Sequence, residues 1–142
     1  MISNKIKKGI LGNISIPSDK SISHRSIIIP SISMGISEVN NLLMSDDVLH
    51  TLNAFKTLGV KIEKLNNKII IYGKGLNSLT KPNKSIYLGN SGTSARLLTG
   101  LLASQPFETV LEGDRSLSSR PMARIMNPLK LMGAEFKNVS GT

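Results

Sequence analysis

The sequence predicts an α/β (α+β) protein built from repeated strand–helix–strand–helix–strand–strand (βαβαββ) units, the second of them incomplete. Three observations lead to this prediction. Strand-like and helix-like patterns alternate along the chain, their order occurs twice, and equivalent residues of the two copies lie 71 positions apart. A hydrophobic content of 39% in 142 residues is also enough to form a core.

The first copy combines alternating apolar stretches with two helical patterns. The expected elements, in order, are a strand at 13–17 ("NISIP"), a helix at 21–33, a strand at 37–42, a helix at 45–59 and a hairpin at 60–73. The second helix has the clearest signal, since Ser45 is suited to be its N-cap and Gly59 to close its end. Pro30 removes a backbone donor from the first helix, so we expect a bend near it.

The second copy repeats this order over the remaining residues. Its expected elements are a strand at 85–90, a helix at 91–103, a strand at 108–113, a helix at 120–133 and a strand that begins at 134. Pro121 suits the first turn of the second of these helices, and Gly133 suits its end. The copy stops at Thr142, before its closing strands, so we expect the unit to be incomplete.

Aligning the two copies supports the repeat. With the shift of 71 residues, "SDKSISHR" lies on "GNSGTSAR", so Ser23 meets Ser94 and Arg25 meets Arg96. So few identities can also arise by chance, and the residues alone leave this open. Two such units favour helices inside with sheets outside, or a layered sandwich. We divide the chain into an opening strand (1–17), a first unit (18–75) and a second unit (76–142).

The composition favours an anionic partner. Lys and Arg outnumber Asp and Glu by 18 to 9, giving a net charge of +9. Aromatic residues are only 4% and Trp is absent, which argues against a single-stranded nucleic-acid platform.

Without cysteine, thiol chemistry and disulfides are excluded, and the two histidines have no metal-ligand spacing, so we expect no metal. No stretch approaches the roughly 20 apolar residues of a membrane span, and we expect a cytoplasmic protein.

Two equivalent helix starts are candidate anion sites, because helix N-termini present unpaired N–H groups and partial positive charge. In "SDKSISHR", Lys20, Ser21 and Arg25 suit a phosphate or carboxylate. The alternative is an ordinary helix cap, for which Ser and Asp are common.

The second start, "GNSGTSAR", offers neutral groups instead. Gly92 lets the backbone approach a ligand, while Asn90 and Thr93 supply hydrogen bonds. The glycines can equally make a simple turn, and no P-loop lysine follows them. Arg120, just before Pro121, marks a third candidate start.

Three motifs together resemble a known family. "SDKSISHR", "LGNSGTSARLLTGLLA" and "GDRSLSSRPMARIMNPLKLMGAEF" are similar, in order and spacing, to the amino-terminal signatures of 5-enolpyruvylshikimate-3-phosphate synthases, the enolpyruvyl transferases of the shikimate pathway. The resemblance covers residues 12–136. It implies the enolpyruvyl transferase fold, in which three βαβαββ units form each inverted α/β barrel lobe, so this chain would hold two units of one lobe. It also implies that the opening strand joins the other lobe.

The resemblance implies roles for the first motif. Lys20 corresponds to a lysine that contacts phosphoenolpyruvate and the phosphate region of shikimate 3-phosphate, and that can also shuttle a proton. Ser21 and Arg25 correspond to residues that bind shikimate 3-phosphate.

The other two motifs would form the phosphoenolpyruvate pocket. Asn90 and Gly92 correspond to residues along this pocket, Thr93 lies next to them, and Arg120 corresponds to an arginine that clamps phosphoenolpyruvate.

The resemblance implies transfer of the enolpyruvyl group to the 5-hydroxyl of shikimate 3-phosphate, with release of phosphate and without cofactor or metal. The family's acid and base carboxylates lie in the carboxyl-terminal part, which we expect as the partner this chain requires for activity. We expect a monomer when the enzyme is complete, with no nucleic-acid or membrane partner. The alternative is a non-catalytic module that binds phosphate or RNA ends, since an RNA 3′-phosphate cyclase uses the same unit.

Overall fold

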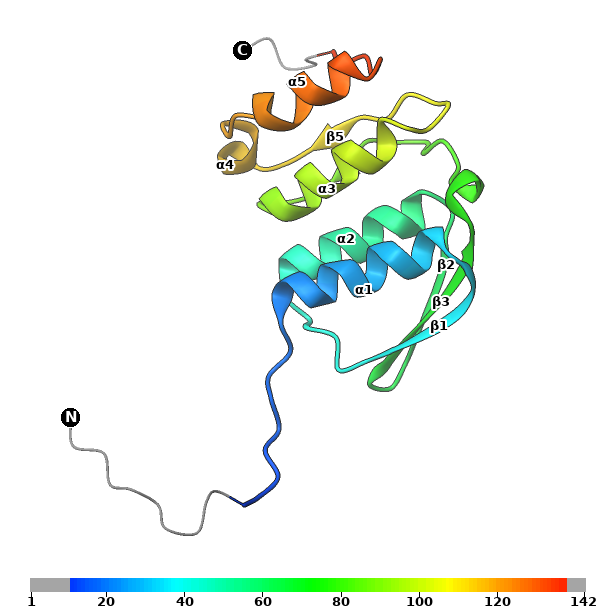
Figure 1. Ribbon diagram of the computed structural model, residues 1–142, viewed down its shortest axis with the longest axis vertical. Coiled ribbons are helices and arrows are strands. Elements are labelled where there is room, and N and C mark those ends of the chain that lie inside the picture. The colour runs from blue at the N-terminus through cyan, green and yellow to red at the C-terminus, as the bar shows by residue number, and fades with distance from the viewer. Residues whose placement is uncertain (1–10, 138–142) are drawn as a thin grey trace, which may run out of the picture.

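A computed structural model describes residues 11–137 of the chain (Figure 1). The first half contains α1 (Lys20–Ile32), β1 (Met34–Asn40), α2 (Asp46–Thr57), β2 (Lys61–Leu65) and β3 (Lys68–Lys74). The second half contains the 3-10 helix η1 (Leu76–Ser78), β4 (Ile86–Tyr87), α3 (Gly92–Leu102), β5 (Leu111–Glu112), α4 (Arg115–Ser118) and α5 (Ala123–Leu131). Mixed helix and strand in this order confirm the predicted fold class.

The first half forms an antiparallel three-stranded sheet with the strand order β1-β3-β2. Ile36 of β1 faces Tyr72 of β3, and Ile62 of β2 faces Ile71 of β3. The β2–β3 hairpin turns through Asn66, whose positive φ of 52° suits a tight two-residue turn. The predicted hairpin is therefore confirmed.

The second half contains a short parallel pair. Strands β4 and β5 pair in parallel, with Ile86 opposite Leu111, and helix α3 connects them. A parallel pair needs such a crossover connection, which explains why a helix separates the two strands.

The core lies between the sheet and the helices. Ile27 of α1, Phe55 of α2, Ile71 of β3 and Leu98 of α3 are completely buried within one continuous cluster. Helix α2 contacts both α1 and α3, and the three-stranded sheet covers the outer side of α1 and α2 (Figure 1). The prediction of helices inside and a sheet outside holds for the first half. The packing of α2 against α1 and α3 also brings the starts of these three helices near one another.

Two predicted strands are absent from the described residues. Residues 11–19 form neither helix nor strand, and Leu11, Ile14 and Ile16 are 100%, 85% and 73% exposed. A strand requires a neighbouring strand to pair with, and within residues 11–137 no strand pairs with this segment. The strand expected to begin at 134 is likewise not formed up to residue 137. The rest of the predicted opening segment (residues 1–10) and the continuation of the last predicted strand (residues 138–142) lie outside the described residues.

Helix α1 runs from Lys20 to Ile32, within one residue of the expected bounds at each end, with Pro30 in its last turn. One helix boundary differs from expectation. Helix α5 begins only at Ala123, which leaves Pro121 ahead of the helix instead of in its first turn. The short helix α4 lies ahead of Pro121, with the Asp114 carboxylate accepting the Leu117 N–H at 2.7 Å, and the sequence does not predict this element.

Candidate functional site

Lys20 is the first residue of α1 and points toward the start of α2. Asp19 caps α1, since its carboxylate accepts the Ile22 N–H at 2.7 Å. The Lys20 ammonium forms an ion pair with the carboxylate of Asp47, in the first turn of α2, and their side chains are 49% and 24% exposed. Lys20 is therefore held over two adjoining helix starts while remaining open to solvent.

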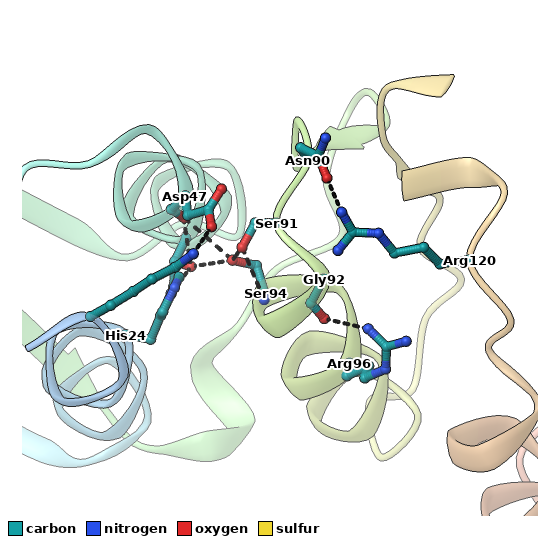
Figure 2. A network of polar contacts seen from close by, with 10 residues as sticks. His24, Asp47, Asn90, Ser91, Gly92, Ser94, Arg96 and Arg120 are labelled. Atoms are coloured by element: carbon teal, nitrogen blue, oxygen red, sulfur yellow. Dashed lines mark hydrogen bonds and ion pairs between the residues drawn. The ribbon is translucent and has the colours of Figure 1, made fainter. Parts of the chain in front are cut away.

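Asn90 lies in the tight turn that leads into α3. Gly89 has a positive φ of 56°, and a Cβ there would lie 2.3 Å from the His50 ring, so only glycine fits. Ser91 is the N-cap of α3. The exposed Asn90 accepts a hydrogen bond from the guanidinium of Arg120 through its side-chain oxygen (Figure 2). This contact brings the segment before α5 to the start of α3.

Two guanidinium groups converge on Gly92, the first residue of α3. Arg96 donates to the Gly92 carbonyl at 3.2 Å, and a Cβ at Gly92 would lie 2.7 Å from Arg120 Nη1 and 2.8 Å from Arg96 Nη1 (Figure 2). Within residues 11–137, no ion pair joins either guanidinium to a carboxylate. Two such cations at a helix N-terminus form an arrangement that attracts a carboxylate or phosphate.

Buried hydroxyl groups connect the Lys20 and Asn90 sides of the site. Thr51 Oγ1 of α2 and Ser94 Oγ of α3 lie 2.7 Å apart, and Ser94 Oγ and Ser91 Oγ lie 2.6 Å apart (Figure 2). Ser94 Oγ and Thr51 Oγ1 each also lie 3.4 Å from the Asp47 carbonyl oxygen. The starts of α2 and α3 are thus joined beneath the charged side chains.

The structure brings together four of the seven residues predicted for the site. Asn90, Gly92 and Arg120 meet at the start of α3, and Lys20 is connected to them through Asp47 and the buried hydroxyls. The other three, Ser21, Arg25 and Thr93, are exposed on α1 and α3. The ligand roles of all seven remain predictions.

Three residues of this arrangement are not among the predicted site residues. Nothing in the linear sequence shows that Asp47 meets Lys20. Arg96 lies on Arg25 when the two copies are aligned, and this equivalence is a signal for it. His24, whose ring is completely buried with Nδ1 against the Thr51 hydroxyl, has no such signal.

The surface around these residues is open. A hollow of about 600 Å³ is lined by Asp114, Arg115, Ser116 and Ser119 and does not include the cations at the start of α3. This hollow is wide and shallow. Lys20, Asn90 and Arg120 are themselves exposed, so a ligand bound by them would remain largely open to solvent on this part of the chain.

The described residues contain no group of three or more His, Cys, Asp or Glu side chains placed to hold a metal ion. Among the helices of residues 11–137, none is both long and apolar enough to cross a membrane.

Burial lowers the pKa of His24 from its ordinary value of 6.5; the charge of Lys20 acts in the same direction and the charge of Asp47 opposes it. In the unfolded chain, His24 regains its ordinary pKa and binds a proton more readily than in the fold. The stability contributed by this group is therefore complete above pH 6.5 and is lost as the pH falls below it.

We expect His24→Asn, which cannot titrate, to weaken the decline of the free energy of unfolding between pH 7.5 and pH 5. Urea denaturation of wild type and variant at each pH measures the difference. Parallel pH dependence in the two proteins would contradict a depressed His24 pKa.

Gly92→Ala should weaken anion binding at the start of α3. The added Cβ would force both guanidinium groups away from Gly92, because contacts of 2.7 and 2.8 Å are too short for a carbon atom. We expect the dissociation constant for inorganic phosphate at this site to rise roughly tenfold, the loss of about one charge-assisted contact. Gly100→Ala is the matched control, since its Cβ would meet nothing within 4 Å; equal dissociation constants for both variants would refute the arrangement.

Comparison with known proteins places these features in a family. Residues 5–142 match the EPSP synthase (3-phosphoshikimate 1-carboxyvinyltransferase) family. The chain is 54% identical over 129 residues to the 3-phosphoshikimate 1-carboxyvinyltransferase of Oenococcus oeni and 52% identical over 129 residues to that of Lactococcus lactis subsp. lactis. In both cases the match covers 91% of this chain and 30% of the relative.

The structural comparison agrees. An EPSP synthase from Acinetobacter baumannii superimposes with a TM-score of 0.84 at 47% sequence identity, over 92% of this chain and 30% of that protein. The chain thus spans about 30% of the length of the relatives it matches, and it is their amino-terminal portion that it resembles. The sequence match over nearly the whole chain and the structural match together show that the chain belongs to the EPSP synthase family.

Proposed function

We propose that the full-length protein is a 3-phosphoshikimate 1-carboxyvinyltransferase, for which this chain supplies one side of the active site. It moves the enolpyruvyl group of phosphoenolpyruvate to the 5-hydroxyl of shikimate 3-phosphate. The observation that supports this best is the convergence of Arg96 and Arg120 on Gly92, with Lys20 connected to the same helix start. Family membership supplies the reaction, and the cation cluster supplies a place for two substrates that carry several negative charges.

The reaction proceeds by addition and then elimination at one carbon. A proton adds to the methylene carbon of phosphoenolpyruvate, and the 5-hydroxyl oxygen bonds to C2 as it loses its own proton, which gives a tetrahedral ketal phosphate. The C2–phosphate oxygen bond then breaks, inorganic phosphate leaves, and the methyl carbon gives up a proton to restore the double bond. Every carbon–oxygen bond formed is matched by one broken, so no cofactor is required.

The cations of this chain would contribute positioning and electrostatic stabilisation. Arg120 clamps phosphoenolpyruvate, with Asn90, Gly92 and Thr93 along its pocket. Holding the two anions in attacking geometry and stabilising the departing phosphate lowers the barrier without covalent chemistry by the protein.

Lys20 would serve both substrates. It contacts phosphoenolpyruvate and the phosphate region of shikimate 3-phosphate, for which Ser21 and Arg25 supply further contacts. Lys20 can also shuttle a proton, while the carboxylates that act as acid and base are provided by the carboxyl-terminal part of the protein. We place the complete enzyme in the cytoplasm as a monomer, without nucleic-acid or membrane partners.

The test is an assay of the full-length gene product with both substrates. We expect phosphate release that depends on phosphoenolpyruvate and shikimate 3-phosphate together, and a product that carries the enolpyruvyl group. Residues 1–142 alone should release none, because the acid and base carboxylates are not among them. Absence of phosphate release by the folded full-length protein at saturating substrates would overturn the proposal.

A further inference from the structure

The imidazole of His24 is completely buried beneath the candidate site. It belongs to the second turn of α1, four residues after Lys20, and none of its surface is exposed. Its Nδ1 atom lies 2.8 Å from Thr51 Oγ1 of α2. Its Nε2 atom is also buried, and within the described residues it has no hydrogen-bond partner. A ring in this position cannot touch a substrate, so any role in the reaction must act through other residues.

His24 is one end of a hydrogen-bonded chain that crosses from the first half of the fold to the second. The chain continues from Thr51 to Ser94 at 2.7 Å and from Ser94 to Ser91 at 2.6 Å, and all four side chains are buried (Figure 2). Ser91 is the N-cap of α3, and its Oγ accepts the Ser94 N–H at 3.2 Å. The chain thus connects α1 and α2 to the cap of the helix that begins at Gly92.

Each hydroxyl has only one proton. The contacts of 2.7 and 2.6 Å along the chain are shorter than the 3.4 Å contacts of Thr51 and Ser94 with the Asp47 carbonyl, so the protons are assigned to the chain and it has a direction. If Nδ1 carries the imidazole proton, it donates to Thr51, Thr51 donates to Ser94, Ser94 donates to Ser91, and Nε2 is an unpaired acceptor. If Nε2 carries the proton, every bond reverses and a buried N–H is left without an acceptor. Buried unpaired N–H groups are rarer in proteins than buried unpaired acceptors, which favours the first arrangement.

We propose that His24 is a positioning residue for the start of α3: its neutral imidazole donates from Nδ1 to Thr51 and, through Ser94, orients Ser91. Because Asn90 and Gly92 flank Ser91, this chain fixes the anion-binding turn relative to Lys20. Its effect on substrate binding rests on the proposed function, whereas the state of the imidazole does not.

The charged groups that act on the ring are Lys20, from its own helix, and Asp47, from α2, and they oppose one another. The groups that α2 and α3 contribute to the chain are neutral hydroxyls. A second ring proton at Nε2 would create a buried donor with no partner. The proposed neutral Nδ1–H form therefore agrees with the hydrogen bonding and with the burial of the ring, which disfavours a charged imidazole.

The first test is nitrogen-15 NMR of the full-length protein with labelled histidine. We expect a protonated, pyrrole-type signal for Nδ1 and an unprotonated, pyridine-type signal for Nε2, both unchanged from pH 8 to pH 6. A protonated Nε2, alone or together with Nδ1, at pH 7.5 would overturn the proposal. This measurement needs no activity, so it distinguishes failure of this inference from failure of the proposed function.

The second test uses side chains that reach one ring nitrogen or the other. The amide of Asn occupies the place of Nδ1, whereas the amide of Gln extends to the place of Nε2. We expect His24→Asn to keep KM within about twofold of wild type, and His24→Gln and His24→Leu to raise the KM for phosphoenolpyruvate about five- to tenfold with a smaller change in kcat, the effect of losing one hydrogen bond. Equal KM values for the Asn and Leu variants would overturn the proposal.

A variant that keeps the packing of the core distinguishes loss of the hydrogen bond from loss of the folded state. Thr51→Val removes the hydroxyl but keeps the shape, and we expect the same rise in KM and a shifted Ser94 amide signal. Thr99→Val is the matched control, because the buried Thr99 hydroxyl bonds to the Ala95 carbonyl of its own helix at 2.7 Å and does not belong to the chain. An equal effect of both substitutions would show that loss of a buried hydroxyl, and not this chain, is responsible.

Discussion

Lys20→Met and Arg120→Ala are each expected to lower the kcat/KM of the full-length enzyme roughly ten- to 150-fold. Each substitution removes a cation proposed to make a charge-assisted contact with an anionic substrate. Such a contact contributes about 1.5–3 kcal/mol, and about 1.4 kcal/mol corresponds to a factor of ten. Met keeps the length of the lysine side chain, so Lys20→Met tests the charge and not the packing. Steady-state phosphate release at varied phosphoenolpyruvate concentration is the measurement.

Lys64→Met is a suitable control for the lost positive charge. Lys64 is exposed on β2, in the three-stranded sheet and away from the three helix starts. It should leave kcat/KM within about twofold of wild type, because exposed charges contribute little. Near-normal turnover of both Lys20→Met and Arg120→Ala would exclude the start of α3 as the phosphoenolpyruvate site.

Phe55→Ala is expected to lower the free energy of unfolding by about 3–5 kcal/mol, the usual cost of deleting a buried aromatic ring. Phe55 is completely buried in α2, which contacts α1 on one side and α3 on the other. The cavity left by the ring would therefore loosen the helix that carries Asp47 and Thr51. Urea denaturation of the full-length protein, followed by circular dichroism, measures the effect.

Leu65→Ala is the corresponding control on the surface. Leu65 ends β2 and is 56% exposed, so its removal should cost well under 1 kcal/mol. If Phe55→Ala were no more destabilising than Leu65→Ala, the core would not be centred on α2 as the structure shows.

Local sequence patterns were enough to predict elements whose pattern lies within the element itself. Helix α2 has apolar residues along one face, and the β2–β3 hairpin has two alternating stretches on either side of Asn66–Asn67, so both could be located from the sequence. The apolar alternation at 13–17 could not determine by itself whether a strand forms there, because a strand forms only beside a pairing partner. Helix α4 was missed because a four-residue helix capped by Asp114 has too short a pattern to recognise.

The site could be predicted only in part for a similar reason. Motif spacing identified Lys20, Asn90 and Arg120, which the fold connects through Asp47 and the α3 turn. Contacts between distant residues, such as Lys20 with Asp47 and His24 with Thr51, depend on how α1 packs on α2 and have no signature in the linear chain.

The position of α5 also has a dynamic consequence. None of its residues is buried, and Leu131 at its end is 90% exposed, while α2 is enclosed by neighbours. Local opening costs least where few apolar contacts are broken. The backbone amides of α5 should accordingly exchange with deuterated solvent well before those of α2, and a surface that shelters this helix would slow that exchange selectively.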